Sequence, residues 1–74
     1  MKNSIENICF KDSFMWISID GVNHKIDLNL VSAKLKNAED VQRNLYKISP
    51  SGYGIHWPLI DEDISIEAIL KNRR

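Results

Sequence analysis

The residues best equipped for chemistry lie in the last third of the chain. His56 is followed by three consecutive acids, Asp61, Glu62 and Asp63. Imidazole nitrogens and carboxylate oxygens bind divalent cations, and His24 would supply a second nitrogen. Their spacing matches neither a zinc motif nor the longer alternating acidic series of an EF-hand calcium loop. We therefore expect no metal site, and expect the acids to solvate a loop and favour the start of the next helix.

Nucleophilic chemistry is the second alternative. Ser49 or Ser51 with His56 and one acid would make a Ser-His-Asp set, and Cys9 with His24 would make a weaker thiol pair. However, the Gly-x-Ser-x-Gly elbow is absent, and a chain of 74 residues leaves little room to enclose a catalytic pocket. We expect no catalytic residue, no cofactor and no enzymatic activity.

Aromatic and acidic side chains in this segment favour recognition of another protein. Tyr53 and Trp57 carry polar groups on large apolar rings, a combination enriched at interaction sites, and Trp16 shares it. We take these three residues, His56 and the three consecutive acids as candidate partner contacts, the acids suiting a basic partner. Packing of the aromatic rings into a small core is the open alternative.

The first part of the chain has the pattern of β-strands. Apolar residues recur with a period of two through residues 7–30, although residues 14–17 are apolar on both faces. Asp20-Gly21 divides the last two runs and readily supplies the positive φ angles of a type I′ turn, so we predict a hairpin over residues 14–28. Phe14 and Trp16 lie on the second face of this hairpin, which we expect another part of the protein to cover partly.

Short helices and strands are predicted to follow. Asn37 is a candidate N-cap for a helix at about 38–45 that would turn Val41 and Leu45 inward. Further strands are predicted at 45–49 and 53–57. Ser65 is predicted to cap a final helix, whose apolar residues recur at helical spacing and form one stripe.

These elements predict the α+β class. We expect a small antiparallel sheet of about four to five strands, with short helices packed on one face, in a single domain over residues 1–74. A domain of this size buries a small core and is expected to have modest stability, which makes a partner subunit or a homodimer plausible.

Charge and hydropathy exclude several classes of protein. Ten basic residues balance ten acidic ones, which disfavours generic binding to nucleic acid, although the basic end at residues 71–74 keeps that alternative open. No apolar run is long enough to span a bilayer, and the opening residues have no signal-peptide core. We expect a cytoplasmic protein, and the single cysteine agrees with that.

One segment is similar to a known family. The block Gly-Tyr-Gly-Ile-His-Trp-Pro at residues 52–58, followed by Ile-Asp-Glu-Asp-Ile-Ser at 60–65, resembles the domain of unknown function family 2442, and the likeness covers most of the chain. Residues 26–30 depart from a Pro-Leu-Ser-Trp type sequence common in that family. Residues 37–40 depart from a common Asn-Ala-Thr-Pro-Glu sequence.

The resemblance implies a compact bacterial or phage α+β protein without an assigned activity. Members of the family are often encoded beside another small protein, in arrangements like toxin–antitoxin pairs, and some carry a helix-turn-helix domain that we do not expect within these residues. The leading hypothesis is a non-enzymatic interaction module, antitoxin-like or accessory in such a pair. The alternatives are a phage or mobile-element inhibitor of a host defence protein, and a nucleic-acid-binding regulator.

Overall fold

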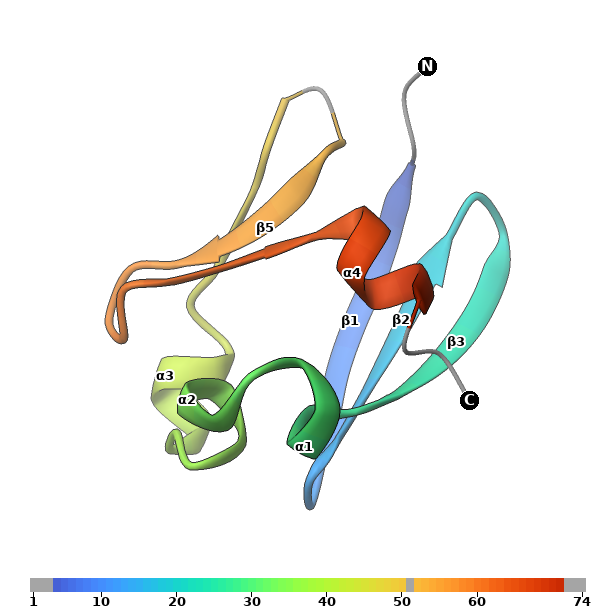
Figure 1. Ribbon diagram of the computed structural model, residues 1–74. Coiled ribbons are helices and arrows are strands. Elements are labelled where there is room, and N and C mark those ends of the chain that lie inside the picture. The colour runs from blue at the N-terminus through green and yellow to red at the C-terminus, as the bar shows by residue number, and fades with distance from the viewer. Residues whose placement is uncertain (1–3, 51, 72–74) are drawn as a thin grey trace.

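Two three-stranded antiparallel sheets form the framework of the protein (Figure 1). The structure is a computed structural model that describes residues 4–50 and 52–71. The first sheet has the order β1 (Ile5–Lys11), β2 (Phe14–Ile19), β3 (Val22–Asp27), and the second the order β4 (Lys47–Ile48), β5 (Gly54–Trp57), β6 (Glu62–Ser65). The α+β class is confirmed. The single sheet of four to five strands is wrong, because the described strands number six and divide between two sheets.

The predicted hairpin is confirmed as β2 and β3. Ile19 pairs with Val22, and the two residues between them both have positive φ, 52° at Asp20 and 81° at Gly21. Both angles are those a type I′ turn requires, and its twist matches that of the flanking strands. The alternation ends earlier than predicted, since the strand stops at Asp27, whose carboxylate accepts a hydrogen bond from the Asn29 amide at 2.9 Å and so caps a helix.

Three single-turn helices connect the two sheets: α1 (Leu28–Val31), α2 (Ala33–Lys36) and α3 (Asp40–Arg43). The predicted helix at 38–45 is shorter than expected, and Asn37 ends α2 instead of starting α3. The inward orientation of Val41 and Leu45 is also wrong, because these side chains are 66% and 49% exposed. Arg43 faces inward instead. Val41 is two positions before Arg43 and therefore lies about 200° away around the helix, on the side that faces solvent.

The final helix, α4 (Ile66–Lys71), follows β6 directly. The Ala68 amide donates to Ser65 Oγ at 3.1 Å, which confirms the predicted cap, and Ile66 and Ile69 are buried as the apolar stripe predicts. No described helix is long and apolar enough to cross a membrane.

One hydrophobic core joins both sheets, α1, α2 and α4. In each sheet, directly paired residues share a face, so the buried members of neighbouring strands form rows that point inward. The rings of Phe10 on β1 and Trp57 on β5 pack edge to face, with centroids 6.4 Å apart, so the inner faces of the two sheets contact each other. The buried members are Met15, Ile17, Ile19, Ile26, Leu28, Leu35, Ile55, Trp57, Ile64, Ile66 and Ile69.

Candidate functional site

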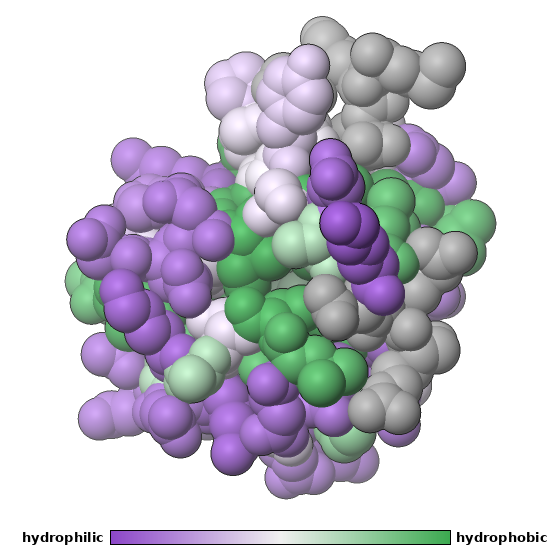
Figure 2. Space-filling view, in the orientation of Figure 1, coloured by the Kyte–Doolittle hydropathy of each residue, from purple (hydrophilic) through white to green (hydrophobic). Residues whose placement is uncertain are grey.

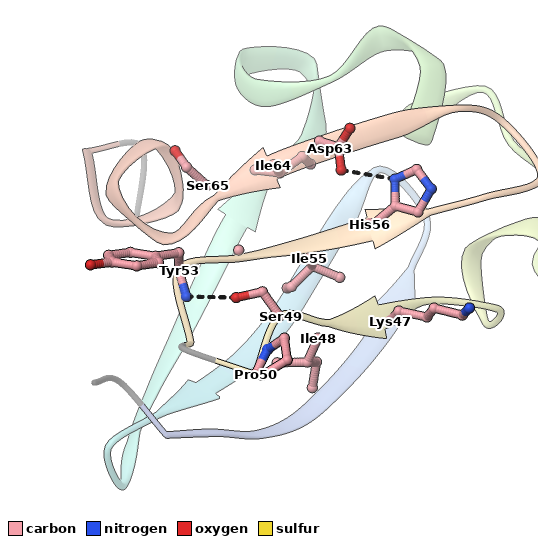
Figure 3. A pocket seen from close by; sticks show the side chains of 11 residues that line it. Lys47, Ile48, Ser49, Pro50, Tyr53, Ile55, His56, Asp63, Ile64 and Ser65 are labelled. Atoms are coloured by element: carbon pink, nitrogen blue, oxygen red, sulfur yellow. Dashed lines mark hydrogen bonds and ion pairs between the residues drawn. The ribbon is translucent and has the colours of Figure 1, made fainter. Parts of the chain in front are cut away.

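A groove of about 570 Å³ lies along the second sheet at its β4 edge (Figure 3). All three strands and the β4–β5 loop contribute to its lining, which is mainly apolar. Gly54 lines one wall, and a Cβ at this position would lie 2.8 Å from the backbone oxygen of Ile64. The close approach of β5 and β6 at this point therefore requires glycine.

The apolar end of the groove is open to solvent. Ile48 lies opposite Ile55 in the strand register, yet it is 39% exposed because β4 is an edge strand that extends beyond the core. Pro50 is exposed beside it, and Tyr53 is 70% exposed (Figure 3). Tyr53 precedes β5 and does not share the buried face of Ile55, contrary to its predicted place in the strand.

Hydrogen bonds fix the loop that carries these side chains. The Ser49 amide donates to the Gly54 carbonyl at 2.9 Å, and the Tyr53 amide donates to Ser49 Oγ at 3.1 Å (Figure 3). The Ser49 hydroxyl thus orders the loop, and Ser51, the other candidate nucleophile, lies outside the described residues. Tyr53 is held at the rim by its backbone while its ring remains exposed.

The polar end of the groove is a histidine–carboxylate pair. His56 on β5 lies directly opposite Asp63 on β6, and Nδ1 of the imidazole is 2.8 Å from Oδ1 of the carboxylate. An ionised carboxylate only accepts hydrogen bonds, so Nδ1 is the donor. Lys47 pairs with His56 on its other side, and the three side chains form a cross-strand row on the outer face. Asp63 is 77% exposed and remains available to a positively charged group.

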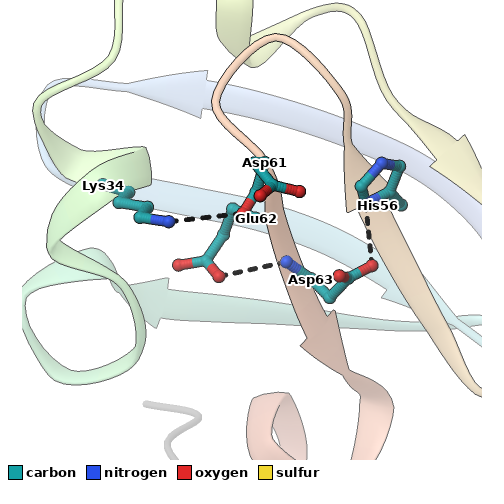
Figure 4. A network of polar contacts seen from close by, with 5 residues as sticks. All are labelled: Lys34, His56, Asp61, Glu62 and Asp63. Atoms are coloured by element: carbon teal, nitrogen blue, oxygen red, sulfur yellow. Dashed lines mark hydrogen bonds and ion pairs between the residues drawn. The ribbon is translucent and has the colours of Figure 1, made fainter.

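Glu62 and Asp63 lie in strand β6 beside α2, so the predicted acidic loop is wrong for these two acids and right for Asp61 alone (Figure 4). Asp61 lies in the turn before β6 with φ of 50°, and its carbonyl accepts from Lys34 Nζ at 3.3 Å. Glu62 accepts from the buried Ser32 hydroxyl at 2.5 Å, and that same hydroxyl caps α2. Of the three acids, Asp63 alone lines the groove.

Trp57 belongs to the core. Its side chain is fully buried, and Nε1 donates to the Arg43 carbonyl at 2.9 Å. Phe10 and Tyr46 contact the indole from two sides. This placement agrees with the core alternative from the sequence and removes Trp57 from the surfaces that a partner can reach.

Arg43 is the important residue that sequence reasoning missed. It is 7% exposed, and its guanidinium donates to the carbonyls of Leu35, Lys36 and Asp12. Because an arginine on a short polar helix is ordinarily solvated, no local signal marks it as buried. Its acceptors come from the β1–β2 turn and the end of α2, which only the folded chain brings together.

The remaining sequence candidates do not converge on the groove. Trp16 lies on the first sheet and is 42% exposed. Cys9 pairs with Trp16 whereas His24 pairs with the buried Ile17, so the thiol and the imidazole are on opposite faces and form no dyad. Within residues 4–50 and 52–71, no group of three or more His, Cys, Asp or Glu side chains is placed to hold a metal ion.

The residues that line the groove lie within the part of the chain that matches a known protein family. The model of the family described as Protein of unknown function (DUF2442) matches residues 5–74, nearly the whole chain. The chain belongs to this family. Neither the curated proteins nor the solved structures gave a match to this DUF2442 protein. The groove and its surrounding contacts are therefore the direct basis for a functional proposal.

Proposed function

We propose that this DUF2442 protein is a non-enzymatic module that binds another protein through the groove along β4, β5 and β6. The observation that carries the proposal is the combination of an apolar groove with exposed Ile48 and Tyr53 at its rim. Exposed apolar surface of this kind is costly to leave in water and is typical of interaction sites. Figure 2 shows apolar surface gathered at the centre of the molecular face drawn in Figure 1, bordered by polar side chains.

The edge strand gives the proposed partner a way to bind. β4 pairs with β5 on one side, and no other described strand borders it. An extended segment of the partner would add to this edge through backbone hydrogen bonds, and its alternate side chains would enter the groove. Asp63 at the polar end favours a lysine or arginine in that segment, a few residues from the apolar anchor.

The role we propose is that of the neutralising or accessory member of a toxin–antitoxin-like pair, acting in the cytoplasm. Inhibition of a host defence protein by the same groove is the alternative target. In both cases the protein acts by occupying a surface of its partner. Tyr53, His56 and Asp63 are the expected contacts retained from the sequence, joined by Ile48, whose exposure sequence reasoning did not predict.

Affinity capture with matched variants tests the proposal. Ile48→Lys places a charge at the apolar end of the groove, and Leu30→Lys makes the same change at an aliphatic residue on α1 that is 55% exposed. We expect the tagged protein and the Leu30→Lys control to retain one stoichiometric partner from the native host, and Ile48→Lys to lose it. Equal recovery by all three proteins would count against the groove.

A second copy of the chain is the competing occupant of the β4 edge. Light scattering of the purified protein separates the two cases. A monomer that forms a one-to-one complex with the captured protein supports the proposal. A homodimer that Ile48→Lys converts to monomer would instead assign the groove to self-association.

A further inference from the structure

The outer face of the first sheet carries a second site, separate from the groove. Phe14 and Trp16 lie two residues apart on β2, the central strand, so their rings share one face. Buried Met15 and Ile17 lie on the opposite face, which packs into the core. Trp16 is 42% exposed, and among the described residues the Lys25 side chain of β3 lies over both rings and gives the expected partial cover.

Lysines lie on both sides of the aromatic pair. Lys25 on β3 pairs with Trp16, and its Nζ is 4.3 Å from the centroid of the Phe14 ring and 5.4 Å from that of the Trp16 ring. Lys11 on β1 pairs with Phe14 and is exposed. The ring faces therefore already bind a cation from the same chain.

The other polar groups of this face are one carboxylate, which is bound to Asn29, and a hydrogen-bonded serine–asparagine row. Asp27 is the carboxylate paired with Phe14, and its Oδ1 accepts from both the backbone and the side-chain amide of Asn29 at 2.9 Å, which directs it toward α1. In the adjacent cross-strand row, Ser18 Oγ donates to Asn23 Oδ1. The NH2 group of Asn23 then remains as a donor on an exposed side chain.

We propose that this face binds single-stranded nucleic acid, with bases stacked on Trp16 and Phe14 and phosphates bound by Lys11 and Lys25. Such a ligand alternates flat rings with negative charges, and aromatic side chains interleaved with cations on an open sheet match both. A stacking base would displace the Lys25 ammonium from the rings, and the freed ammonium would meet the neighbouring phosphate. Paired bases inside a duplex present no free face, so binding should be specific for single strands.

Zero net charge sets the expected strength of this binding. The chain has no overall positive field to attract a polyanion, so stacking must supply most of the affinity. Two lysine–phosphate contacts predict that log Kobs falls with log[salt] with a slope of about −1.4, since each contact on a single strand contributes about −0.7. A shallow slope of this size distinguishes the site from generic binding by a basic tail.

Fluorescence titration with an oligo(dT) of about 12 nucleotides tests the proposal, since sites of this kind span about 4–16 nucleotides. The chain has two tryptophans, and Trp57 is fully buried, so quenching on binding reports Trp16. We expect saturable quenching by the single strand and weaker binding of a duplex of the same length. Fluorescence anisotropy of a labelled strand then measures the affinity of each variant for that strand.

The variants separate stacking from charge. Trp16→Ala should weaken binding at least about fivefold, whereas Trp16→Phe should keep most of the affinity because an aromatic face remains. Lys25→Gln should reduce the salt slope by about 0.7, and the control Lys47→Gln, on the second sheet, should leave it unchanged. Circular dichroism checks that each variant keeps its fold.

Four results would overturn the proposal. They are absence of saturable binding at about 1 mM strand, equal affinity for the duplex, unchanged affinity in Trp16→Ala, and a homodimer that Trp16→Ala converts to monomer. The last would make this face a contact between copies. The aromatic face and the groove lie on different sheets. The result of protein capture with Ile48→Lys therefore does not bear on nucleic-acid binding, and either proposal can fail while the other holds.

Discussion

The substitution Arg43→Met tests whether a buried guanidinium holds the β1–β2 turn to the helices. Arg43 Nε donates to the Leu35 carbonyl at 3.1 Å, Nη2 to Lys36 at 2.7 Å and Nη1 to Asp12 at 2.9 Å. Two of these acceptors are the last carbonyls of α2, and the third lies in the turn between β1 and β2. Methionine fills a similar volume with a flexible side chain but donates no hydrogen bond.

The magnitude follows from the contacts that are lost. Each of the three hydrogen bonds that the guanidinium loses costs about 1 kcal/mol, and the Leu35 carbonyl keeps the Ala38 amide as a donor at 3.3 Å. The guanidinium also lies 5.5 Å from the centroid of the Phe10 ring, a contact worth about 0.5–1 kcal/mol. The variant removes the cost of burying a charge as well, so we expect a net loss of about 3 kcal/mol. For a chain of this size the total free energy of unfolding is about 4–11 kcal/mol, so the loss is a large share of it.

Urea unfolding followed by tryptophan fluorescence measures the effect, since Trp57 bonds directly to the Arg43 carbonyl. With a slope of about 1 kcal/mol per M, the midpoint should fall by about 3 M. Lys36→Met removes an exposed cation from the adjoining helix and should cost less than about 0.5 kcal/mol. Arg43→Lys keeps the charge but not the fork of donors and should fall between the two. A loss below about 1 kcal/mol in Arg43→Met, or an equal loss in Lys36→Met, would refute the reasoning.

Three further substitutions test neighbouring parts of the fold by thermal unfolding. Trp57→Phe should cost about 1–3 kcal/mol, because it removes a buried hydrogen bond and part of a core ring; a melting temperature within error of the parent would contradict this. Ser32→Ala should cost about 1–2 kcal/mol, since one hydroxyl caps α2 and binds β6, and the exposed cap variant Ser65→Ala should cost less. Gly54→Ala should cost about 2 kcal/mol or more, because the new Cβ would clash with the backbone of β6. The control Gly21→Ala should cost about 1 kcal/mol, because Gly21 has a positive φ but open space around it. A larger cost for Gly21→Ala than for Gly54→Ala would disprove the close-approach argument.

Much of the first half of the fold could be predicted because its signals are local. The β2–β3 hairpin follows from period-two alternation and from Asp20-Gly21, whose backbone preferences set the turn without help from the rest of the chain. The cap at Ser65 and the buried Ile66 and Ile69 likewise depend on spacing along one helix.

The candidate site was predicted only in part. Tyr53, His56 and Asp63 do line one groove, but their neighbour Trp57 points into the core, because side chains alternate along β5. The polarity of Glu62 and Asp63 indicates a loop, although both residues lie in a strand. On an edge strand, polar residues face solvent or reach across to α2 as Glu62 does, so β6 has a single buried side chain, Ile64.

The sequence by itself determined the family, the α+β class, the hairpin and the final helix, because each depends on residues close together in the chain. Tertiary structure alone decided the division into two sheets, the burial of Arg43 and the exposure of Val41. These features depend on which backbone carbonyls and which apolar faces meet in space. A guanidinium can be buried only where separate segments supply its acceptors, and no local pattern records that meeting.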